Sequence, residues 1–226
     1  MLASGGIRTD NESKHLGQLL SKLKEQTVPA DEIDIVVVDS GSTDDTVPIA
    51  ESHGARVVRI DRETFSFGRS LNVGCNAAQG DYLVFVSGHC IPVREDWLQR
   101  LTEPLTREPV AYTYGRQVGD HTSRLSECQL FKKYFPDYSR IPQEGFFCNN
   151  ANAALRRSVW EQNHFDEELT GLEDMELGQR LLKAGLALGY VAEAPVYHLH
   201  NESWHKVRMR YEREAIALQQ IMPQVH

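Results

Sequence analysis

The chain has 226 residues, of which 41% are hydrophobic and 25% are charged, a composition typical of a globular protein with one sizeable core. Its formal net charge of −8 argues against a protein whose whole surface binds a nucleic acid, and no nucleic acid partner is expected. The four cysteines form no CxxC pair, which disfavours both a zinc knuckle and a small disulfide scaffold. Because neither a signal peptide nor an apolar stretch of roughly 20 residues is evident, we expect one cytoplasmic domain.

The first half of the chain alternates between helical and strand patterns. Leucines at helical spacing predict a helix that ends near residue 27: Leu16, Leu19, Leu20 and Leu23. The β-branched run at 33–38 predicts a strand buried on both faces, and a helix that ends at His53 and Gly54 follows it. The next predicted elements are a strand, a helix, a buried strand and a helix, at 56–60, 69–79, 82–86 and 97–105. This order predicts a mainly parallel, open α/β sheet that binds ligands beyond the carboxyl ends of its strands.

The pattern changes after about residue 110. Aromatic residues mixed with glycines and prolines over 110–150 predict an irregular region that shapes a pocket or a lid. Regular structure is expected again at 152–156, in a helix over about 173–184 and in a long helix over about 203–221. At the other end of the chain, the segment 1–7 contains Gly5 and Gly6 and is by propensity a poor central strand.

Polar residues follow the first buried strand directly. Asp39 stands at the tip of this strand, where a carboxylate can accept hydrogen bonds from a base or a ribose, and Gly41 lets a ligand approach the backbone. An ordinary turn before a helix explains the same residues about equally well. The chain has neither GxGxxG after a strand nor GxxxxGK[ST], so a nicotinamide dehydrogenase and a P-loop phosphotransferase are both disfavoured.

Five segments carry a resemblance to a known family: Ile7–Glu12, Val36–Asp44 with Thr46, Phe67–Gly74, Ala78–Tyr82 and Gly171–Glu176. In order and spacing they resemble the motifs of family 2 inverting glycosyltransferases of the GT-A fold. The resemblance implies a single GT-A domain over residues 1–226, with a nucleotide-binding part at about 1–105, an acceptor-side part at about 106–201 and a C-terminal helix at about 203–221. It also implies sugar transfer with inversion from a nucleoside diphosphate sugar to an acceptor hydroxyl, in surface glycan or polysaccharide biosynthesis.

The resemblance places the nucleotide sugar across the ends of the strands. The residues that it implies for this donor are Arg8, Glu12, Asp39, Ser40, Arg69, Asn72 and Ser87. Arg69 suits this place because a guanidinium pairs with a diphosphate or stacks on a base. A surface arginine at the start of a helix is the alternative explanation.

The chain departs from the family at the metal-binding Asp-x-Asp, whose place is taken by Ser87, Gly88 and His89. Mg²⁺ loses its preferred carboxylates there, whereas an imidazole suits Mn²⁺ or another transition metal better. His89 could instead donate a hydrogen bond to a phosphate. By resemblance, a second metal ligand is expected from His198 or His200, which share a face of an extended segment, with His198 slightly preferred. We therefore expect a divalent cofactor, Mn²⁺ or Mg²⁺.

Glu173 and Asp174 form the proposed catalytic pair. Inversion needs one base that takes the proton of the acceptor hydroxyl, and the resemblance implies Asp174 as that base with Glu173 beside it. Acidic residues in a first helical turn also complement the helix dipole in any protein. On the acceptor side the resemblance implies Asn150 and Asn152, since amides both donate to and accept from sugar hydroxyls.

Two other functions remain open. A sugar-nucleotide nucleotidyltransferase needs a glycine-rich, basic loop after the first strand, and the segment 4–8 is short for one. A non-catalytic carbohydrate-binding homologue is favoured by the missing metal carboxylates and disfavoured by Glu173 and Asp174. The resemblance implies an acceptor that is a saccharide or a lipid-linked molecule. Separately, basic residues of the last helix, such as Lys206 and Arg213, predict peripheral contact with anionic lipids at the inner face of a membrane. A solvated, packed terminal helix is the alternative.

Overall fold

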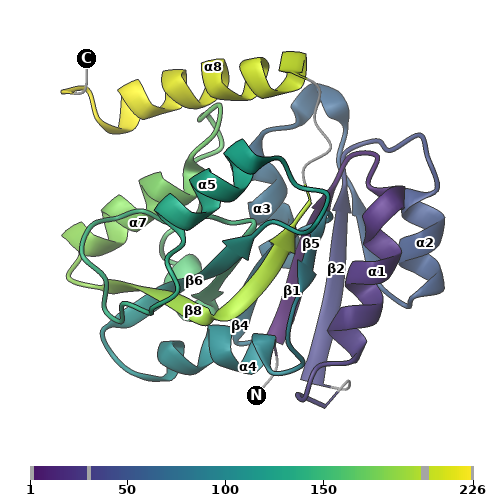
Figure 1. Ribbon diagram of the computed structural model, residues 1–226, viewed down its shortest axis with the longest axis horizontal. Coiled ribbons are helices and arrows are strands. Elements are labelled where there is room, and N and C mark those ends of the chain that lie inside the picture. Colours follow the sequence, from purple (N-terminus) through teal and green to yellow (C-terminus); the bar gives the residue numbers. More distant parts are fainter. Residues whose placement is uncertain (1–2, 30–31, 200–203, 225–226) are drawn as a thin grey trace.

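One eight-stranded sheet forms the centre of the computed structural model, which describes residues 3–29, 32–199 and 204–224. The strand order is β3-β2-β1-β4-β7-β6-β8-β5, with helices on both faces of the sheet (Figure 1). The pairs β3–β2, β2–β1, β1–β4 and β6–β8 are parallel. The pairs β4–β7, β7–β6 and β8–β5 are antiparallel. The sheet is therefore mixed and mostly parallel, and the predicted α/β class is confirmed.

The first half of the chain forms the parallel part of the sheet. Its elements are β1 (Ala3–Thr9), α1 (Ser13–Lys24), β2 (Ile33–Asp39), α2 (Thr46–Ser52), β3 (Arg56–Arg59), the 3₁₀ turn η2 (Arg62–Thr64), α3 (Phe67–Ala77) and β4 (Tyr82–Ser87). The rest of the chain adds β5 (Cys90–Pro92), α4 (Trp97–Thr102), the 3₁₀ turn η3 (Glu103–Thr106), β6 (Val110–Val118), α5 (Leu125–Tyr134), β7 (Asn152–Arg156), α6 (Arg157–Trp160), α7 (Glu173–Lys183), β8 (Ala187–His198) and α8 (Trp204–Ile221).

The sheet has a hydrophobic core on each face because its central strands are apolar on both sides. On β2, Val37 packs into the core that contains the leucines of α1 and α4. Its neighbours Val36 and Val38 pack into the opposite core, which contains Leu71 of α3 and Leu177 of α7. The prediction of a strand buried on both faces is confirmed here.

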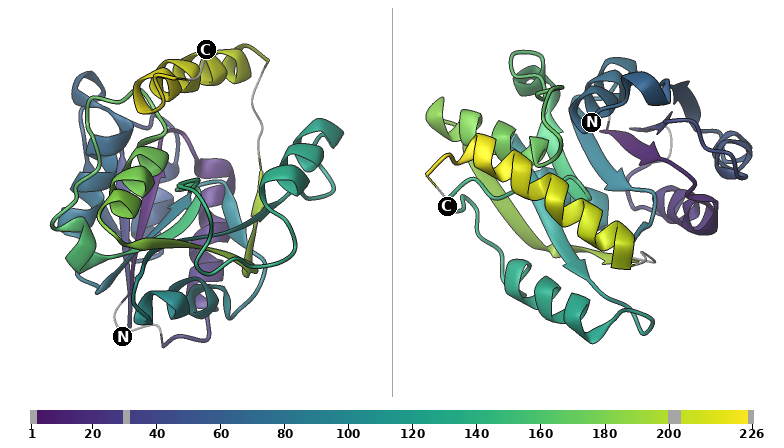
Figure 2. Two further views of the ribbon diagram at one scale, coloured as in Figure 1. Left: turned by 90° about the vertical axis from the view of Figure 1, so that its left-hand side faces the viewer. Right: turned by 90° about the horizontal axis from the view of Figure 1, so that it is seen from above.

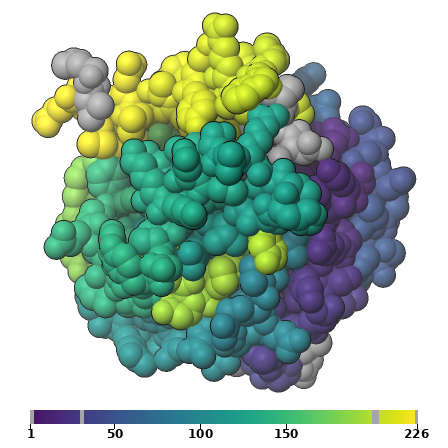
Figure 3. Space-filling model, in the orientation of Figure 1, coloured from purple at the N-terminus to yellow at the C-terminus, as the bar shows by residue number. Residues whose placement is uncertain are grey.

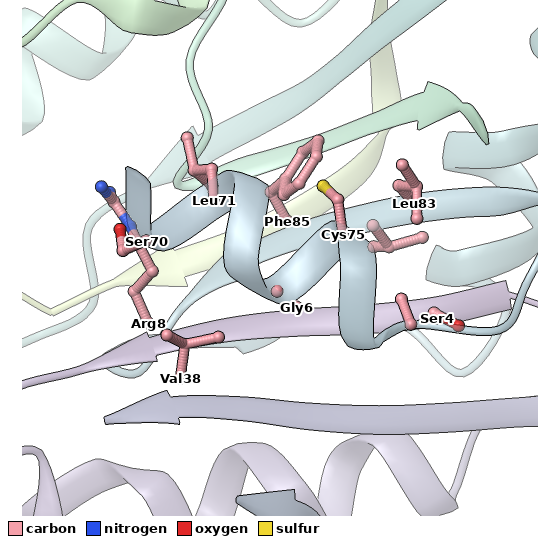
Figure 4. Close-up of a pocket in the computed structure, with 12 residues that line it drawn as sticks. Ser4, Gly6, Arg8, Val38, Ser70, Leu71, Cys75, Leu83 and Phe85 are labelled. Carbon is pink, nitrogen blue, oxygen red and sulfur yellow. The ribbon is translucent and has the colours of Figure 1, made fainter. Parts of the chain in front are cut away.

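The glycine-bearing segment at the start of the chain forms β1, which lies between β2 and β4 at the middle of the parallel part. Its propensity is poor, but ladders on both sides satisfy its backbone, and the side chain of Ile7 is fully buried. The missing side chain of Gly6 contributes to a small cavity of about 10 Å³ between β1 and α3, near Cys75 and Phe85 (Figure 4). The propensity argument against a central first strand is therefore wrong.

The prediction of an irregular region over 110–150 is also wrong for two segments. Residues 110–118 form the nine-residue strand β6, which pairs with both β7 and β8. Residues 125–134 form α5, in which Phe131 is the buried residue. A helix with so few buried positions has little hydrophobic periodicity, so its pattern resembles that of a loop.

Helix α8 lies across the carboxyl-end edge of the parallel strands, and Figure 2 shows it from above as the outermost element. It is attached through Ala217 and Ile221, which are buried. Its surface adjoins that of α5 (Figure 3). The guanidinium carbon of Arg124, the residue before α5, lies 4.7 Å from the centroid of the Trp204 ring. Among the described residues, no helix is long and apolar enough to cross a membrane.

Candidate active site

The predicted site residues gather at the carboxyl ends of β1, β2 and β4. Arg8 of β1 stands in register with Val38 of β2 on one side and with Ser87 of β4 on the other. Asp39 ends β2, and the first turn of α7 brings Glu173 to within 3.5 Å of the Arg8 guanidinium. Residues from distant parts of the sequence thus meet where open α/β sheets bind ligands.

Asp174 is held rigidly in the first turn of α7. Its Oδ2 accepts the backbone N–H of Asn150 at 2.9 Å, and its Oδ1 accepts that of Met175 at 2.8 Å. The residue is only 8% exposed. Each carboxylate oxygen still has a second lone pair, so both hydrogen bonds orient the group without using up its capacity to accept a proton.

The environment of Asp174 suits a base. Burial, together with the neighbouring charge of Glu173, raises the pKa of Asp174 to about 7, although two backbone N–H groups and Arg8 act in the opposite direction. A carboxylate with an ordinary pKa is a weak proton acceptor, whereas one titrating near neutral pH can both ionise and abstract a proton. The same shift would be unusual for an acidic residue that only complements a helix dipole.

Two residues in the left-handed backbone region stand directly before site residues. Leu172, with φ of 57°, precedes Glu173, and Asn11, with φ of 59°, precedes Glu12. They are the only residues other than glycine with a positive φ in the part of the chain that the structure describes. A leucine in this region is strained, and such strain concentrates where the surrounding structure must aim a functional group.

Asn150 carries a buried donor beside the carboxylate. Its Oδ1 accepts the hydroxyl of the fully buried Tyr112 at 2.5 Å, which fixes the orientation of the amide. Its Nδ2 has no hydrogen-bond partner among the described residues, although the residue is only 4% exposed. An unpaired buried N–H group costs free energy, so this amide is suited to a ligand oxygen next to Asp174.

His89 and His198 face one another at a second point of the site. Their Nε2 atoms are 3.1 Å apart. Nδ1 of His89 lies 2.8 Å from Glu12 Oε1, and Nδ1 of His198 lies 2.6 Å from Gln117 Oε1. Carboxylate and amide oxygens accept hydrogen bonds, so each Nδ1 carries the proton and each Nε2 presents a lone pair. A shared proton or a cation is needed between them.

This arrangement fits a transition metal better than Mg²⁺. Two nitrogens that bind one ion at right angles, each at about 2.1 Å, are about 3 Å apart. Partners that hold the other ring nitrogen, as Glu12 and Gln117 do here, are typical of metal-binding histidines. However, no group of three His, Cys, Asp or Glu residues that could hold a metal occurs within 3–29, 32–199 and 204–224. His200, the other predicted ligand, lies outside the described residues.

Asp39 and Ser40, which were predicted to bind the nucleotide sugar, make hydrogen bonds that hold the loop after β2. Asp39 is 2% exposed and accepts hydrogen bonds from Thr9 Oγ1, Ser42 Oγ and the backbone N–H groups of Gly41 and Ser42. Ser40 donates its hydroxyl to the Thr9 carbonyl. Both residues therefore fix the loop after β2, and the contact to a nucleoside that was predicted for them remains a prediction.

Three further predicted residues have structural partners. Asn72 is buried and joins α3 to the segment before α7 through the Phe165 backbone and Glu167, which supports the approach to Asp174. Arg69 lies 3.8 Å from Glu167 and is half exposed. Asn152 is fully buried, and its amide bonds Trp97 and two backbone carbonyls, so the structure does not bring it to the acceptor side. Ser87 ends β4 beside Arg8.

Sequence reasoning missed the partners that orient the predicted residues. Gln117 and Tyr112 lie on β6, inside the segment that was predicted to be irregular. Recognition of a strand at 110–118 would have placed these two side chains on specific faces of the sheet. Phe67 was also missed; its ring lies 4.9 Å from the Arg8 guanidinium carbon.

The sequence matches Glycosyl transferase family 2 over residues 6–163, which is more than half of the chain. The chain belongs to this family. The match spans β1 to β7 and includes Arg8, Asp39 and His89, while Glu173 and Asp174 follow it. Family membership identifies the chain as a glycosyltransferase of the GT-A fold and confirms the resemblance that the motifs indicated.

Curated relatives extend the similarity toward the C-terminus. The chain is 28% identical over 217 residues to the O-antigen chain rhamnosyltransferase RfbN of Salmonella typhimurium, covering 91% of this chain and 68% of that protein. It is 29% identical over 188 residues to the O-antigen chain rhamnosyltransferase WbaN of Salmonella anatum, covering 78% of this chain and 60% of the relative. Both are longer proteins than this family 2 chain.

Solved structures share the fold. The mannosyltransferase PcManGT of Pyrobaculum calidifontis, in complex with GDP-Man and Mn²⁺, has a TM-score of 0.75 at 18% identity, covering 97% of this chain and 62% of its own. TarS of Staphylococcus aureus, residues 1–349 in complex with UDP-GlcNAc, has a TM-score of 0.67 at 20% identity, covering 96% and 65%. At this level of identity they establish the shared architecture of the family 2 domain.

Proposed function

We propose that this chain transfers a glycosyl group from a nucleoside diphosphate sugar to an acceptor hydroxyl with inversion, and that Asp174 is the base. The observation that supports the proposal most strongly is the buried Asp174 carboxylate, whose pKa is raised to about 7 and whose two oxygens are oriented by backbone N–H groups. Family 2 membership gives the reaction type, and this carboxylate gives the reaction its proton acceptor.

The proposed step needs three functions from the chain's own residues. The Asp174 carboxylate takes the acceptor hydroxyl proton as the oxygen attacks the anomeric carbon and the bond to the diphosphate breaks. The unpaired Nδ2–H of Asn150 donates to an oxygen of the acceptor or of the transferred sugar. Arg8, which lies 3.5 Å from the Glu173 carboxylate, supplies a positive charge that stabilises the negative charge developing on the leaving group.

We further propose that His89 and His198 hold a divalent transition ion such as Mn²⁺ against the diphosphate. When bound, this ion supplies electrostatic stabilisation of the leaving group. The converging Nε2 atoms and the fixed Nδ1 partners support the proposal, as does the Mn²⁺ in the structurally similar mannosyltransferase. Mn²⁺ titration followed by electron spin resonance should show a site in the wild type and a much weaker one in His89→Ala. Equal affinities would contradict the assignment.

The acceptor is proposed to be a saccharide or a lipid-linked saccharide of a bacterial surface polysaccharide. The names of RfbN and WbaN, which act on O-antigen chains, support this class. Exposed apolar side chains on α8, among them Trp204, Met209 and Ile216, support contact with a membrane surface at the inner face. Sedimentation with phosphatidylglycerol vesicles should carry the protein down, while vesicles of phosphatidylcholine alone should not. Equal recovery with both would contradict an anionic lipid partner.

A donor screen tests the proposed function directly. Uridine, guanosine and thymidine diphosphate sugars are incubated with the protein in Mn²⁺, in Mg²⁺ and in chelator, and release of nucleoside diphosphate is measured. We expect release from one nucleotide class, fastest in Mn²⁺. Formation of pyrophosphate from a sugar phosphate and a nucleoside triphosphate would instead indicate a nucleotidyltransferase. Saccharide binding in a calorimeter without any nucleotide binding would indicate a non-catalytic homologue.

A further inference from the structure

Arg213, near the middle of α8, turns toward the catalytic loop instead of toward solvent. It shares one helix face with the buried residues Ala217 and Ile221, which follow at intervals of four residues. The hydroxyl of Thr170 donates to the backbone carbonyl of Arg213 at 3.1 Å, and the side chain lies close to Gly171. The helix thus places a guanidinium next to the segment that leads into Glu173 and Asp174.

Two guanidinium groups converge on one aromatic ring at this place. The Arg213 guanidinium carbon lies 4.3 Å from the centroid of the Phe67 ring, and that of Arg8 lies 4.9 Å from the same centroid. The groups come from α8 and β1, whereas Phe67 is the first residue of α3. Stacking on an aromatic face stabilises a cation but leaves the in-plane N–H groups available for an oxyanion.

The Nε–H donor of Arg213 lacks an acceptor in the part of the chain that the structure describes. Its Nε is buried and has no hydrogen-bond partner among the described residues, and no side-chain ion pair of Arg213 occurs there. Burial, with repulsion from Arg210 and Arg8, lowers the pKa of Arg213 despite the nearby Glu214 and Glu173 carboxylates. The contact between Arg8 and Glu173, at 3.5 Å, is long for a hydrogen bond. Within the described part of the chain the two cations therefore have few acceptors: Arg8 has a long contact with Glu173, and the buried Nε of Arg213 has none.

We propose that Arg213 and Arg8 together bind a phosphate oxyanion, foremost that of the donor diphosphate, and that α8 is therefore a part of the active site. A guanidinium binds phosphate through two parallel hydrogen bonds, which matches the planar groups held on Phe67. The inference rests on the proposed function, because a nucleoside diphosphate sugar supplies the anion. A phosphorylated acceptor would bring the same chemistry, and the experiment distinguishes the two sources.

The experiment measures the binding of UDP, GDP and dTDP, and of the corresponding nucleosides, by calorimetry. In Arg213→Gln we expect the dissociation constant of the bound nucleoside diphosphate to rise on the order of tenfold to a hundredfold, with little change for the nucleoside. Arg213→Lys should lie between, because it keeps the charge but loses the planar pair of donors. The control is Arg208→Gln on the same helix, where the exposed side chain pairs with Glu212, and it should bind as the wild type does.

A stability measurement separates binding from packing. An unpaired cation is removed in Arg213→Gln, so its melting temperature should equal or exceed that of the wild type. If Arg213 only attached α8, the melting temperature would fall and nucleotide binding would stay unchanged, which would overturn the proposal. Inorganic phosphate added to the nucleotide-saturated protein provides the other arm. If Arg213→Gln abolishes the binding of inorganic phosphate and leaves nucleotide binding unchanged, the bound oxyanion is that of the acceptor. Arg213 and Arg8 then still form an anion-binding site.

The failure of this inference differs from the failure of the proposed function. If the wild type binds and cleaves a nucleotide sugar and Arg213→Gln matches it in every arm, the oxyanion site is wrong and the glycosyltransferase assignment stands. If the wild type binds no nucleoside diphosphate, the proposed donor class fails. Inorganic pyrophosphate then decides the inference alone: loss of its binding in Arg213→Gln supports the site, and equal binding in both proteins overturns it.

Discussion

Replacement of Glu173 by Gln should shift the pH dependence of catalysis. The pKa of Asp174 is raised from 3.8 to about 7, first by burial and second by the charge of Glu173. Burial persists in the variant, so the pKa of Asp174 should fall only part of the way, by about one unit, which corresponds to about 1.4 kcal/mol. The loss of Glu173 also leaves Arg8 without its nearest carboxylate, and this acts in the same direction.

The assay is kcat/KM against pH from 5 to 9, with each profile scaled to its own plateau. A base must be ionised, so activity rises as pH increases through the pKa of Asp174. At pH 6 the wild type should reach about a tenth of its plateau and Glu173→Gln about half, roughly a fivefold difference. Glu176→Gln is the matched control, because Glu176 lies in the same helical turn but pairs with Arg180, and its profile should not move. A Glu173→Gln profile that coincides with that of the wild type would show that the charge of Glu173 does not raise the pKa of Asp174.

Three predictions concern stability. Gly6→Ala should raise the free energy of unfolding, measured by urea unfolding, by about 0.4 to 1 kcal/mol. The added Cβ would lie in ordinary contact, 3.6 Å from the Val84 carbonyl oxygen, and would restrict the unfolded chain. Gly68→Ala should prevent stable folding, since its Cβ would fall 1.9 Å from the Asp166 carbonyl oxygen. A melting curve like that of the wild type would contradict the close packing of Gly68 against Asp166. In the wild type the free energy of unfolding should fall by about 2 to 3 kcal/mol between pH 5 and 8.5, because the pKa of Asp174 is higher in the folded protein than in the unfolded chain, and Asp174→Asn should lack this decrease.

The sequence predicts the parallel half of the sheet well because its signals are local. The run at 33–38 has β-branched residues on both faces, and the leucines from Leu16 to Leu23 leave no doubt about a helix. The segments that it mispredicts depend on distant partners. Strand β6 contains Gly115, where a Cβ would lie 2.4 Å from the Ala194 carbonyl oxygen, so this residue reflects close packing against β8 and not a loop. No local pattern encodes such a constraint.

The candidate site shows the same division. Asp174, His89 and His198 are predicted by motif order, and the structure brings their groups to one edge of the sheet. Side chains from β6 orient these groups: Gln117 fixes His198, and Tyr112 fixes the Asn150 amide beside Asp174. The sequence did not reveal these two partners. The position of Arg213 was also beyond sequence reasoning, because a helix that is mostly exposed does not reveal which of its basic residues points inward.

The role of Asp174 as the base is best tested by the release of nucleoside diphosphate from the donor found in the screen, measured side by side at pH 8 for the wild type and for Asp174→Asn. Asparagine preserves the size of the side chain but cannot accept the acceptor proton. We expect a rate at least about a hundredfold lower in the variant, with nucleoside diphosphate affinity unchanged. Turnover of Asp174→Asn at the wild-type rate would contradict the assignment of Asp174 as the base.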